Sequence, residues 1–345
     1  MAQPRYRILV VAPSWVGDMV MAQTLFKRLH QLHPSLELDV LAPDWTIPLL
    51  SRMPEVREAI SNPFRHGEFK PGARYRLGRS LRARSYDQAI VLPNSWKSAL
   101  VPFFAGIPLR TGYSGEMRWG LLNDRRKLDK NKLPLMVERF VALADAPGST
   151  LRLPLPQPAL SVDESRRRAT LAKFGLAEGT KIAALCVGAE YGPAKRWPPQ
   201  HFAELGKQLH QQGYQVWLAG SAKDAEAGSE AARLSGGACL DLCGKTSLDE
   251  VVDLLASATV VVSNDSGLMH VAAALGKPLI ALYGSSSPGF TPPLSQKAHI
   301  VSLHLPCGPC FKRECPLGHL DCLMKLTPQQ VLDEITVALD KEDHG

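Results

Sequence analysis

The sequence contains no long hydrophobic run. No stretch approaches the roughly 20 apolar residues that a helix needs to span a bilayer. The N-terminus passes from Met1 into the strand-like segment from Tyr6 to Val11 without the hydrophobic core of a signal peptide. Together these absences predict a cytoplasmic protein, and any contact with a membrane would be peripheral.

Three motifs of common enzyme classes are also missing. No G-x-G-x-x-G follows the first predicted strand, which disfavours a nicotinamide-dependent dehydrogenase. Gly244-Lys245-Thr246 resembles the end of a P-loop, but Cys239 stands where that motif needs its first glycine, so a P-loop NTPase is excluded. The sequence also has no G-x-S-x-G nucleophile elbow.

The cysteines do not suggest a disulfide framework. Their number, seven, is odd, and no secretion signal is evident. Four of them form the pattern Cys307-x2-Cys310-x4-Cys315-x6-Cys322, which encloses His319. The first pair has zinc-ligand spacing, but no second C-x-x-C follows. A structural metal stays an alternative; we predict reduced thiols in a Gly/Pro-rich loop and no metal.

Positive charge is in excess. Lys plus Arg outnumber Asp plus Glu by 40 to 33, a formal net charge of +7, which suits an anionic partner. The stretch from position 65 to position 84 contains seven lysines and arginines and a single acid, Glu68. A solvated helix face would explain part of this stretch. Nucleic acid is disfavoured, because the sequence has no RRM, zinc-finger or helix-turn-helix signature.

Strand and helix patterns alternate along the chain. A strand at 7–12, a helix at 19–33 and a strand at 36–42 form a βαβ unit, and a further strand spans 86–93. This alternation predicts an α/β fold with a parallel, doubly wound sheet.

A proline-rich segment separates two such halves. Prolines alternate with other residues from Leu153 to Pro158, which favours an extended connector. We therefore predict a domain at 1–160, a second at 161–326 and a C-terminal helix and tail at 327–345. Thr327 to Gln330 form a capping box with Pro328 at the first helical position.

Three loops follow predicted strands, where ligands bind in open α/β sheets. The first, 14–18, ends in Asp18, an N-cap or a general base. The second, 188–198, carries Lys195, which suits phosphate, although a surface Lys-Arg pair is the simpler explanation. The third, Ser263 to His270, leads into a helix expected to begin at Asp265 or Ser266. Its free N–H groups suit phosphate, with Asp265 as an N-cap.

Taken together, these segments resemble the ADP-heptose–lipopolysaccharide heptosyltransferases. The resemblance covers essentially the whole chain and is carried by Val16-Gly17-Asp18, by Lys195-Arg196-Trp197-Pro198 and by Ser263 to His270. The loop 188–198 and the cysteine-rich segment 307–322 are most similar to the type II members. Each motif is weak alone, but their order and spacing are specific.

The resemblance implies an inverting GT-B glycosyltransferase with two Rossmann-like domains facing a cleft. The family's catalytic aspartate corresponds to Asp18, and its phosphate-contacting lysine to Lys195. The donor-binding segment corresponds to Asp265, Ser266, Gly267 and His270. Type I enzymes have two hydroxyl residues where this chain has Glu190 and Tyr191; Glu190 would repel a diphosphate unless it faces the sugar.

The implied reaction moves L-glycero-D-manno-heptose from ADP-heptose to the first heptose of heptosyl-Kdo2-lipid A, with inversion. Arg65, Lys70 and Asn94 are candidate acceptor-binding residues. No cofactor is expected, a need for a divalent cation is left open, and a monomer is expected. The alternatives are a GT-B transferase or a non-hydrolysing epimerase that uses another nucleotide sugar.

Overall fold

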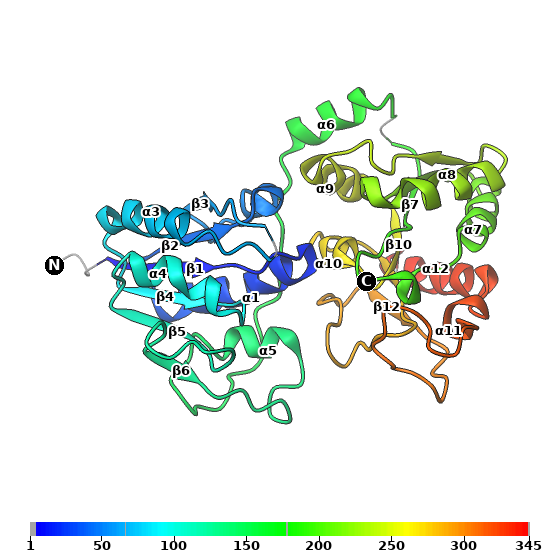
Figure 1. Ribbon diagram of the computed structural model, residues 1–345. Coiled ribbons are helices and arrows are strands. Elements are labelled where there is room, and N and C mark those ends of the chain that lie inside the picture. Colours follow the sequence, from blue (N-terminus) through cyan, green and yellow to red (C-terminus); the bar gives the residue numbers. More distant parts are fainter. Residues whose placement is uncertain (1–4, 66, 177–178, 344–345) are drawn as a thin grey trace. The chain divides into compact units, whose positions relative to one another are not determined.

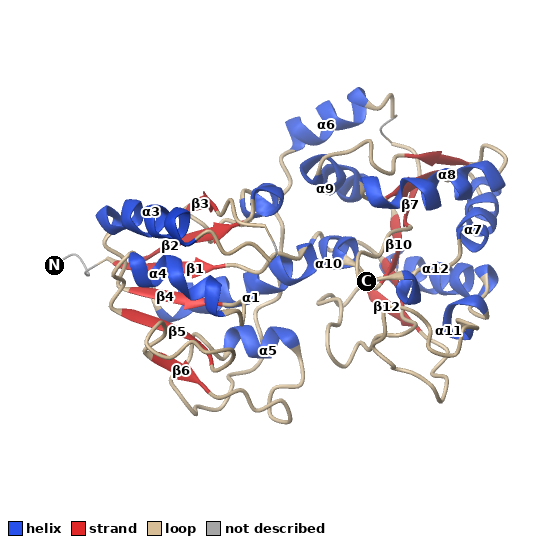
Figure 2. Cartoon of the chain, viewed as in Figure 1, coloured by secondary structure: helices blue, strands red, loops and turns tan. Residues whose placement is uncertain are grey.

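A computed structural model describes residues 5–65, 67–176 and 179–343 (Figure 1). The chain divides into two compact units after Pro158, at the end of the proline-rich segment. Each unit contains one six-stranded sheet in which all paired strands are parallel, with helices packed against it (Figure 2). None of the helices in these ranges is both long and apolar enough to cross a membrane.

The first unit is built around the sheet β3-β2-β1-β4-β5-β6. Its strands are β1 (Tyr6–Val11), β2 (Leu36–Ala42), β3 (Glu58–Ser61), β4 (Gln88–Val91), β5 (Leu109–Tyr113) and β6 (Asp124–Arg126). Its helices are α1 (Val16–Leu32), α2 (Ile47–Leu50), α3 (Pro71–Leu81), α4 (Leu100–Phe104) and α5 (Met136–Val141).

The central strand β1 is buried on both faces, which explains why its sequence is a continuous apolar run. Leu9 and Val11 belong to one core cluster together with Leu81 at the end of α3 and Val101 of α4. Because side chains alternate along a strand, Ile8 points to the opposite face, where α1 and α5 pack against each other.

The second unit is built around the sheet β12-β11-β10-β7-β8-β9. Its strands are β7 (Ile182–Cys186), β8 (Gln215–Ala219), β9 (Cys239–Asp241), β10 (Val260–Asn264), β11 (Leu279–Leu282) and β12 (Ala298–Val301). Its helices are α6 (Glu164–Lys173), α7 (Pro199–Gln211), α8 (Ala225–Leu234), α9 (Leu248–Ser257), α10 (Gly267–Ala274), α11 (Asp321–Met324) and α12 (Pro328–Asp343).

The two sheets have the same topology. Numbered along the chain within each unit, both have the strand order 3-2-1-4-5-6, the doubly wound arrangement of Rossmann-like domains. This confirms the predicted fold class. The strand order reverses between β1 and β4 in the first unit and between β7 and β10 in the second. Ligands of such sheets bind at these switch points, beyond the carboxyl ends of the strands.

The C-terminal helix belongs to the second unit. Its predicted capping box is confirmed, since the Thr327 N–H donates to Gln330 Oε1 at 2.9 Å and the Gln330 N–H donates to Thr327 Oγ1 at 3.3 Å. Val331 and Ile335 lie in one core cluster with residues of α7, β7 and β10. α12 therefore completes the core of the second sheet.

Two helices begin at residues other than those predicted. α1 starts at Val16 rather than Met19, with Trp15 as its N-cap. α10 starts at Gly267, with Ser266 as its N-cap, rather than at Asp265 or Ser266. The cause is the sheet: the Asp265 N–H donates to Leu282 O of the neighbouring β11 at 3.1 Å, so Asp265 still belongs to the strand ladder.

Candidate active site

The switch point of the second unit contains a buried ion pair. Lys195 Nζ lies 2.5 Å from Asp265 Oδ2, although the two residues are 70 positions apart. The Asp265 side chain is 5% exposed and that of Lys195 is 16% exposed. Lys195 ends the short helix η4 (Pro193–Lys195) in the loop after β7, and Asp265 directly follows β10. The fold therefore joins two of the predicted phosphate-site residues.

Asn264 holds the two loops of this switch point together. Its amide donates to Val187 O at 2.9 Å, and its Oδ1 accepts the Trp197 backbone N–H at 3.0 Å. Asn264 had no predicted role. The available signal was a polar residue at the end of the buried run Val260 to Val262, which would be costly to bury without hydrogen bonds.

The start of α10 has no side-chain cap. Ser266 makes no capping hydrogen bond, and its Oγ lies 3.2 Å from Ser263 Oγ. The predicted N-cap role of Asp265 is wrong, because its carboxylate is turned to Lys195. The first N–H groups of α10, beginning with Gly267, therefore retain donor capacity next to a lysine, an arrangement suited to an anion.

His270 lies one turn into α10 and is buried. Burial lowers the pKa of its imidazole to about 4; the positive charge of Lys195 acts in the same direction and Asp265 opposes it. At neutral pH the ring is therefore uncharged. Any hydrogen bond that His270 donates to a ligand comes from the N–H of a neutral imidazole.

The buried imidazole predicts a pH dependence of stability. Its pKa is about 4 when folded and near the ordinary value of 6.5 when unfolded, so its contribution is present above pH 6.5 and lost as the pH falls toward 4. The loss should amount to about 3 kcal/mol in the free energy of unfolding. Chemical denaturation between pH 7 and 4 should give a shallower dependence for His270→Asn. The exposed His210→Asn variant should keep the wild-type slope.

Glu190 and Tyr191 are both turned toward protein partners. The Glu190 carboxylate forms an ion pair with Lys223, which removes much of the repulsion expected toward a diphosphate. The Tyr191 hydroxyl donates to Phe311 O at 2.8 Å, and Lys195 Nζ lies 5.1 Å from the centre of the Tyr191 ring. Tyr191 therefore connects the loop after β7 to the cysteine-rich segment.

The switch point of the first unit carries Asp18. This residue is half-buried in the first turn of α1, three positions after the N-cap Trp15, so the alternative of an N-cap role for Asp18 is wrong. A first-turn carboxylate is stabilised by the helix dipole. Trp45 Nε1 donates to Ser14 O at 3.0 Å and fixes the loop that precedes Asp18.

The candidate acceptor residues also follow strands of the first sheet. Asn94, after β4, is exposed and accepts a hydrogen bond from Arg118 at 3.1 Å through its Oδ1. Lys70 forms an ion pair with Glu68 at 3.0 Å, and Glu68 also accepts the backbone N–H of Arg65. The Arg65 and Lys70 side chains remain exposed beyond the end of β3.

Part of the basic stretch has a structural role. Arg74 is buried and donates to the backbone carbonyls of Phe69 at 2.6 Å and Glu68 at 3.0 Å. Arg84 forms ion pairs with Glu58 at 2.5 Å and with the buried Asp39 at 3.3 Å. The charge available to an anionic ligand is therefore smaller than the sequence predicts.

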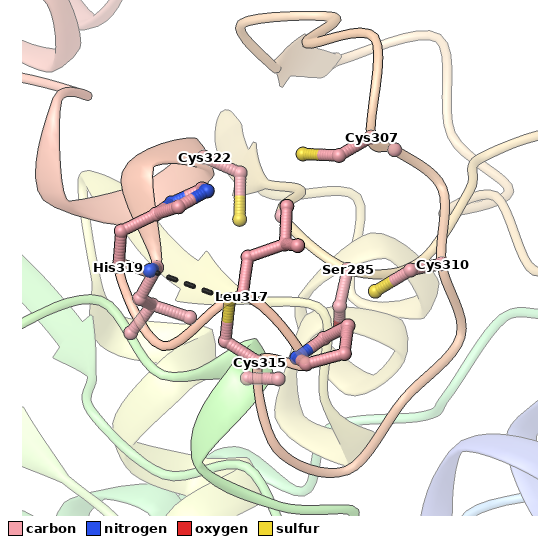
Figure 3. A pocket seen from close by; sticks show the side chains of 12 residues that line it. Ser285, Cys307, Cys310, Cys315, Leu317, His319 and Cys322 are labelled. Carbon is pink, nitrogen blue, oxygen red and sulfur yellow. Dashed lines mark hydrogen bonds between the residues drawn. The ribbon is translucent and has the colours of Figure 1, made fainter.

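The cysteine-rich segment forms a pocket of its own. Figure 3 shows the sulfur atoms of Cys307, Cys310, Cys315 and Cys322 directed toward a common pocket. The Leu320 N–H donates to Cys315 Sγ at 3.4 Å, and such backbone donors lower the pKa of that thiol. All cysteines are free thiols. In the described part of the chain, no group of three or more His, Cys, Asp or Glu side chains has the arrangement of a metal site.

Comparison with known proteins finds similarity to heptosyltransferases, both for the family model and for individual relatives. The family model described as glycosyltransferase family 9 (heptosyltransferase) matches residues 74–321. Lipopolysaccharide heptosyltransferase 2 of Escherichia coli is 53% identical over 98% of this chain and 99% of its own length. Lipooligosaccharide heptosyltransferase 2 of Haemophilus influenzae is 48% identical over 97% of this chain and 99% of its own length.

The solved structures agree with these relatives. The structure of the E. coli ADP-heptose lps heptosyltransferase II superposes with a TM-score of 0.88 at 51% identity, and covers 98% of this chain and 99% of that one. E. coli heptosyltransferase WaaC with ADP has a TM-score of 0.71 at 24% identity over 95% of this chain and 99% of its own, a similarity of fold alone.

Proposed function

Because the chain belongs to glycosyltransferase family 9, the heptosyltransferases, we propose that it transfers L-glycero-D-manno-heptose from ADP-heptose to the first heptose of the lipopolysaccharide inner core. The observation that carries the proposal is the Lys195–Asp265 pair beside the uncapped start of α10, at the switch point of the second sheet. These groups suit a nucleoside diphosphate. The full-length similarity to heptosyltransferase 2 supports the choice of sugar and acceptor.

The second unit would bind the donor. In this proposal the diphosphate lies at the start of α10, where the backbone N–H groups of Gly267 and the residues after it donate to its oxygens. Lys195 adds a charge-assisted contact, and His270 donates through a neutral N–H. All three contributions stabilise the negative charge that grows on ADP as the anomeric C–O bond breaks.

The first unit would activate the acceptor. Asp18 takes the proton from the attacking hydroxyl of the acceptor heptose, and that oxygen forms the new bond to the anomeric carbon. ADP leaves from the opposite face in the same displacement, so the configuration inverts. No covalent enzyme intermediate is needed. In this proposal the protein groups alone stabilise the leaving diphosphate, without a cofactor.

The acceptor would be held by the exposed positive charges beyond β3. Arg65 and Lys70, with Asn94 after β4, would contact the phosphorylated Kdo-bearing core of heptosyl-Kdo2-lipid A. Because that acceptor is anchored in a membrane, we propose that a monomer in the cytoplasm reaches it from the inner leaflet. The electrostatic part of this contact should weaken as salt is added.

Transfer from a panel of donors tests this function. The purified protein, heptosyl-Kdo2-lipid A and either ADP-heptose or UDP-sugars are incubated, and the products are weighed by mass spectrometry. ADP-heptose should give an acceptor heavier by one heptose. The melting temperature of the protein is measured in parallel with ADP-heptose, ADP, UDP-sugars and nucleic acid, and only ADP-heptose and ADP should raise it. Transfer or stabilisation with a UDP-sugar instead would support the alternative of another nucleotide sugar, and a shift with nucleic acid would point to a different class of protein.

A further inference from the structure

The loop after β7, residues 188–198, carries Lys195 and is called the donor loop below. Most cations in and beside it are neutralised by carboxylates. Three of them, in this loop and in the loop after β8, have an acidic partner within 4.0 Å. The pairs are Lys195 with Asp265, Lys223 with Glu190, and Arg196 with Asp224. His270 adds no charge, because burial keeps its imidazole neutral. The groups that the proposed function assigns to the diphosphate therefore carry little net positive charge.

A diphosphate needs more positive charge than these groups supply. It carries at least two negative charges at neutral pH, and the buried Asp265 carboxylate lies beside the lysine that should bind it. Backbone N–H groups and one paired lysine leave this charge incompletely balanced in a partly buried site, where an unbalanced charge is costly. A further cation with no carboxylate of its own is therefore expected close to Lys195.

Arg313 fits this description. Its side chain is exposed, and among the described residues no carboxylate lies within 4.0 Å of its guanidinium. Its Cζ lies 5.4 Å from the centre of the Tyr191 ring, and Lys195 Nζ lies 5.1 Å from the centre of the same ring. One aromatic side chain thus contacts both cations, and the guanidinium offers the planar fork that suits phosphate oxygens.

The backbone of this segment is fixed against the donor loop. Arg313 O accepts the Ala194 N–H at 3.0 Å, one residue before Lys195. The close approach needs a glycine, since a Cβ on Gly192 would lie 2.5 Å from that carbonyl oxygen. Two residues earlier, the Phe311 N–H donates at 2.7 Å to Ser285 O, beyond the carboxyl end of β11. Arg313 is thus anchored by its backbone at the switch-point edge, and its side chain is exposed.

We propose that Arg313 is a second cation for the donor diphosphate, supplied by the cysteine-rich segment and held beside Lys195 by Tyr191. The inference rests on the proposed function, because it assumes that the diphosphate binds at Lys195. It gives the segment 307–322 a role: its backbone carries an arginine to the loop after β7, whose Lys195 lies more than 100 residues earlier in the chain. It also assigns Tyr191 the task of positioning that arginine.

Nucleotide affinity measured by calorimetry tests the proposal. Arg313→Ala should weaken ADP binding about 10-fold, the size expected for one charge-assisted contact in a partly exposed site. Arg313→Lys should recover part of the loss, because it keeps the charge but not the fork. Lys312→Ala is the matched control: Lys312 is the exposed neighbour, and its removal should change affinity less than twofold. Adenosine, which has no phosphate, should bind all variants equally.

The outcomes separate this inference from the proposed function. If Lys195→Ala weakens ADP binding and Arg313→Ala does not, Arg313 only stacks on Tyr191 and the inference is wrong. If neither variant affects ADP binding, the diphosphate lies elsewhere and the proposed function loses its donor site. An equal loss for Arg313→Ala and Lys312→Ala would indicate a diffuse surface effect and would also overturn the inference.

Discussion

Replacing Asp18 with asparagine is expected to lower turnover by about 100-fold or more, the usual size of a general-base effect, and to leave ADP affinity nearly unchanged. The amide has almost the same shape as the carboxylate but cannot accept the proton of the acceptor hydroxyl. Asp18 belongs to the first unit, and the proposed nucleotide site lies in the second. The variant should therefore separate catalysis from donor binding.

The pH profile distinguishes a base from a residue that only supports the fold. A general base must be deprotonated, so the wild-type kcat/KM should rise as the pH is raised and the base loses its proton. This limb should disappear in Asp18→Asn. The exposed Asp129→Asn, also in the first unit, should keep both the turnover and the profile of the wild type. A near-normal turnover for Asp18→Asn would remove Asp18 from the base role.

The locations of the candidate groups could be predicted because they depend on local patterns. The apolar runs of β1, β7 and β10 and the turn residues after them identify where the strands end, and parallel sheets bind ligands at those ends. Asp18, Lys195 and the stretch that begins at Ser263 were recognised in this way. The same patterns do not predict which residues these side chains contact.

The partners of these side chains could not be predicted, because they depend on which strands are neighbours. Lys195 meets Asp265 only because β7 lies beside β10, and Arg84 meets Asp39 across the first sheet. From the sequence alone, Arg84 therefore counts as available charge. The predicted start of α10 is also too early, since the hydrogen bond from the Asp265 N–H to Leu282 O requires knowledge of β11. Each error concerns a contact between residues distant in sequence.

Arg313 illustrates the same limit for function. From the sequence, its segment was notable for its cysteines, which were predicted to be reduced thiols with a structural metal as the alternative. The contact with Tyr191 joins residues more than 100 positions apart and leaves no periodic or motif signal. Only the folded arrangement shows that the arginine of this segment contacts the same aromatic ring as Lys195.

Replacing Lys195 with alanine is expected to weaken ADP binding by about 10- to 100-fold, the range for a hydrogen bond to a charged group. Two effects combine in this loss. The attraction of the ammonium for the diphosphate disappears, and the buried Asp265 carboxylate is left unpaired beside the bound anion. Lys245→Ala is the matched control, because the Lys245 side chain is exposed and forms an ion pair with Asp241, and this variant should bind ADP like the wild type.

A second substitution separates the two effects. Asp265→Asn in the Lys195→Ala background removes the unpaired charge, so the double variant should bind ADP more tightly than Lys195→Ala alone, and it should also melt at a higher temperature. The difference between the double variant and the wild type then measures what Lys195 and Asp265 contribute together to nucleotide binding. Unaltered ADP affinity in Lys195→Ala would disprove the phosphate assignment. A loss that Asp265→Asn does not relieve would mean that the missing attraction dominates and that the carboxylate faces away from the nucleotide.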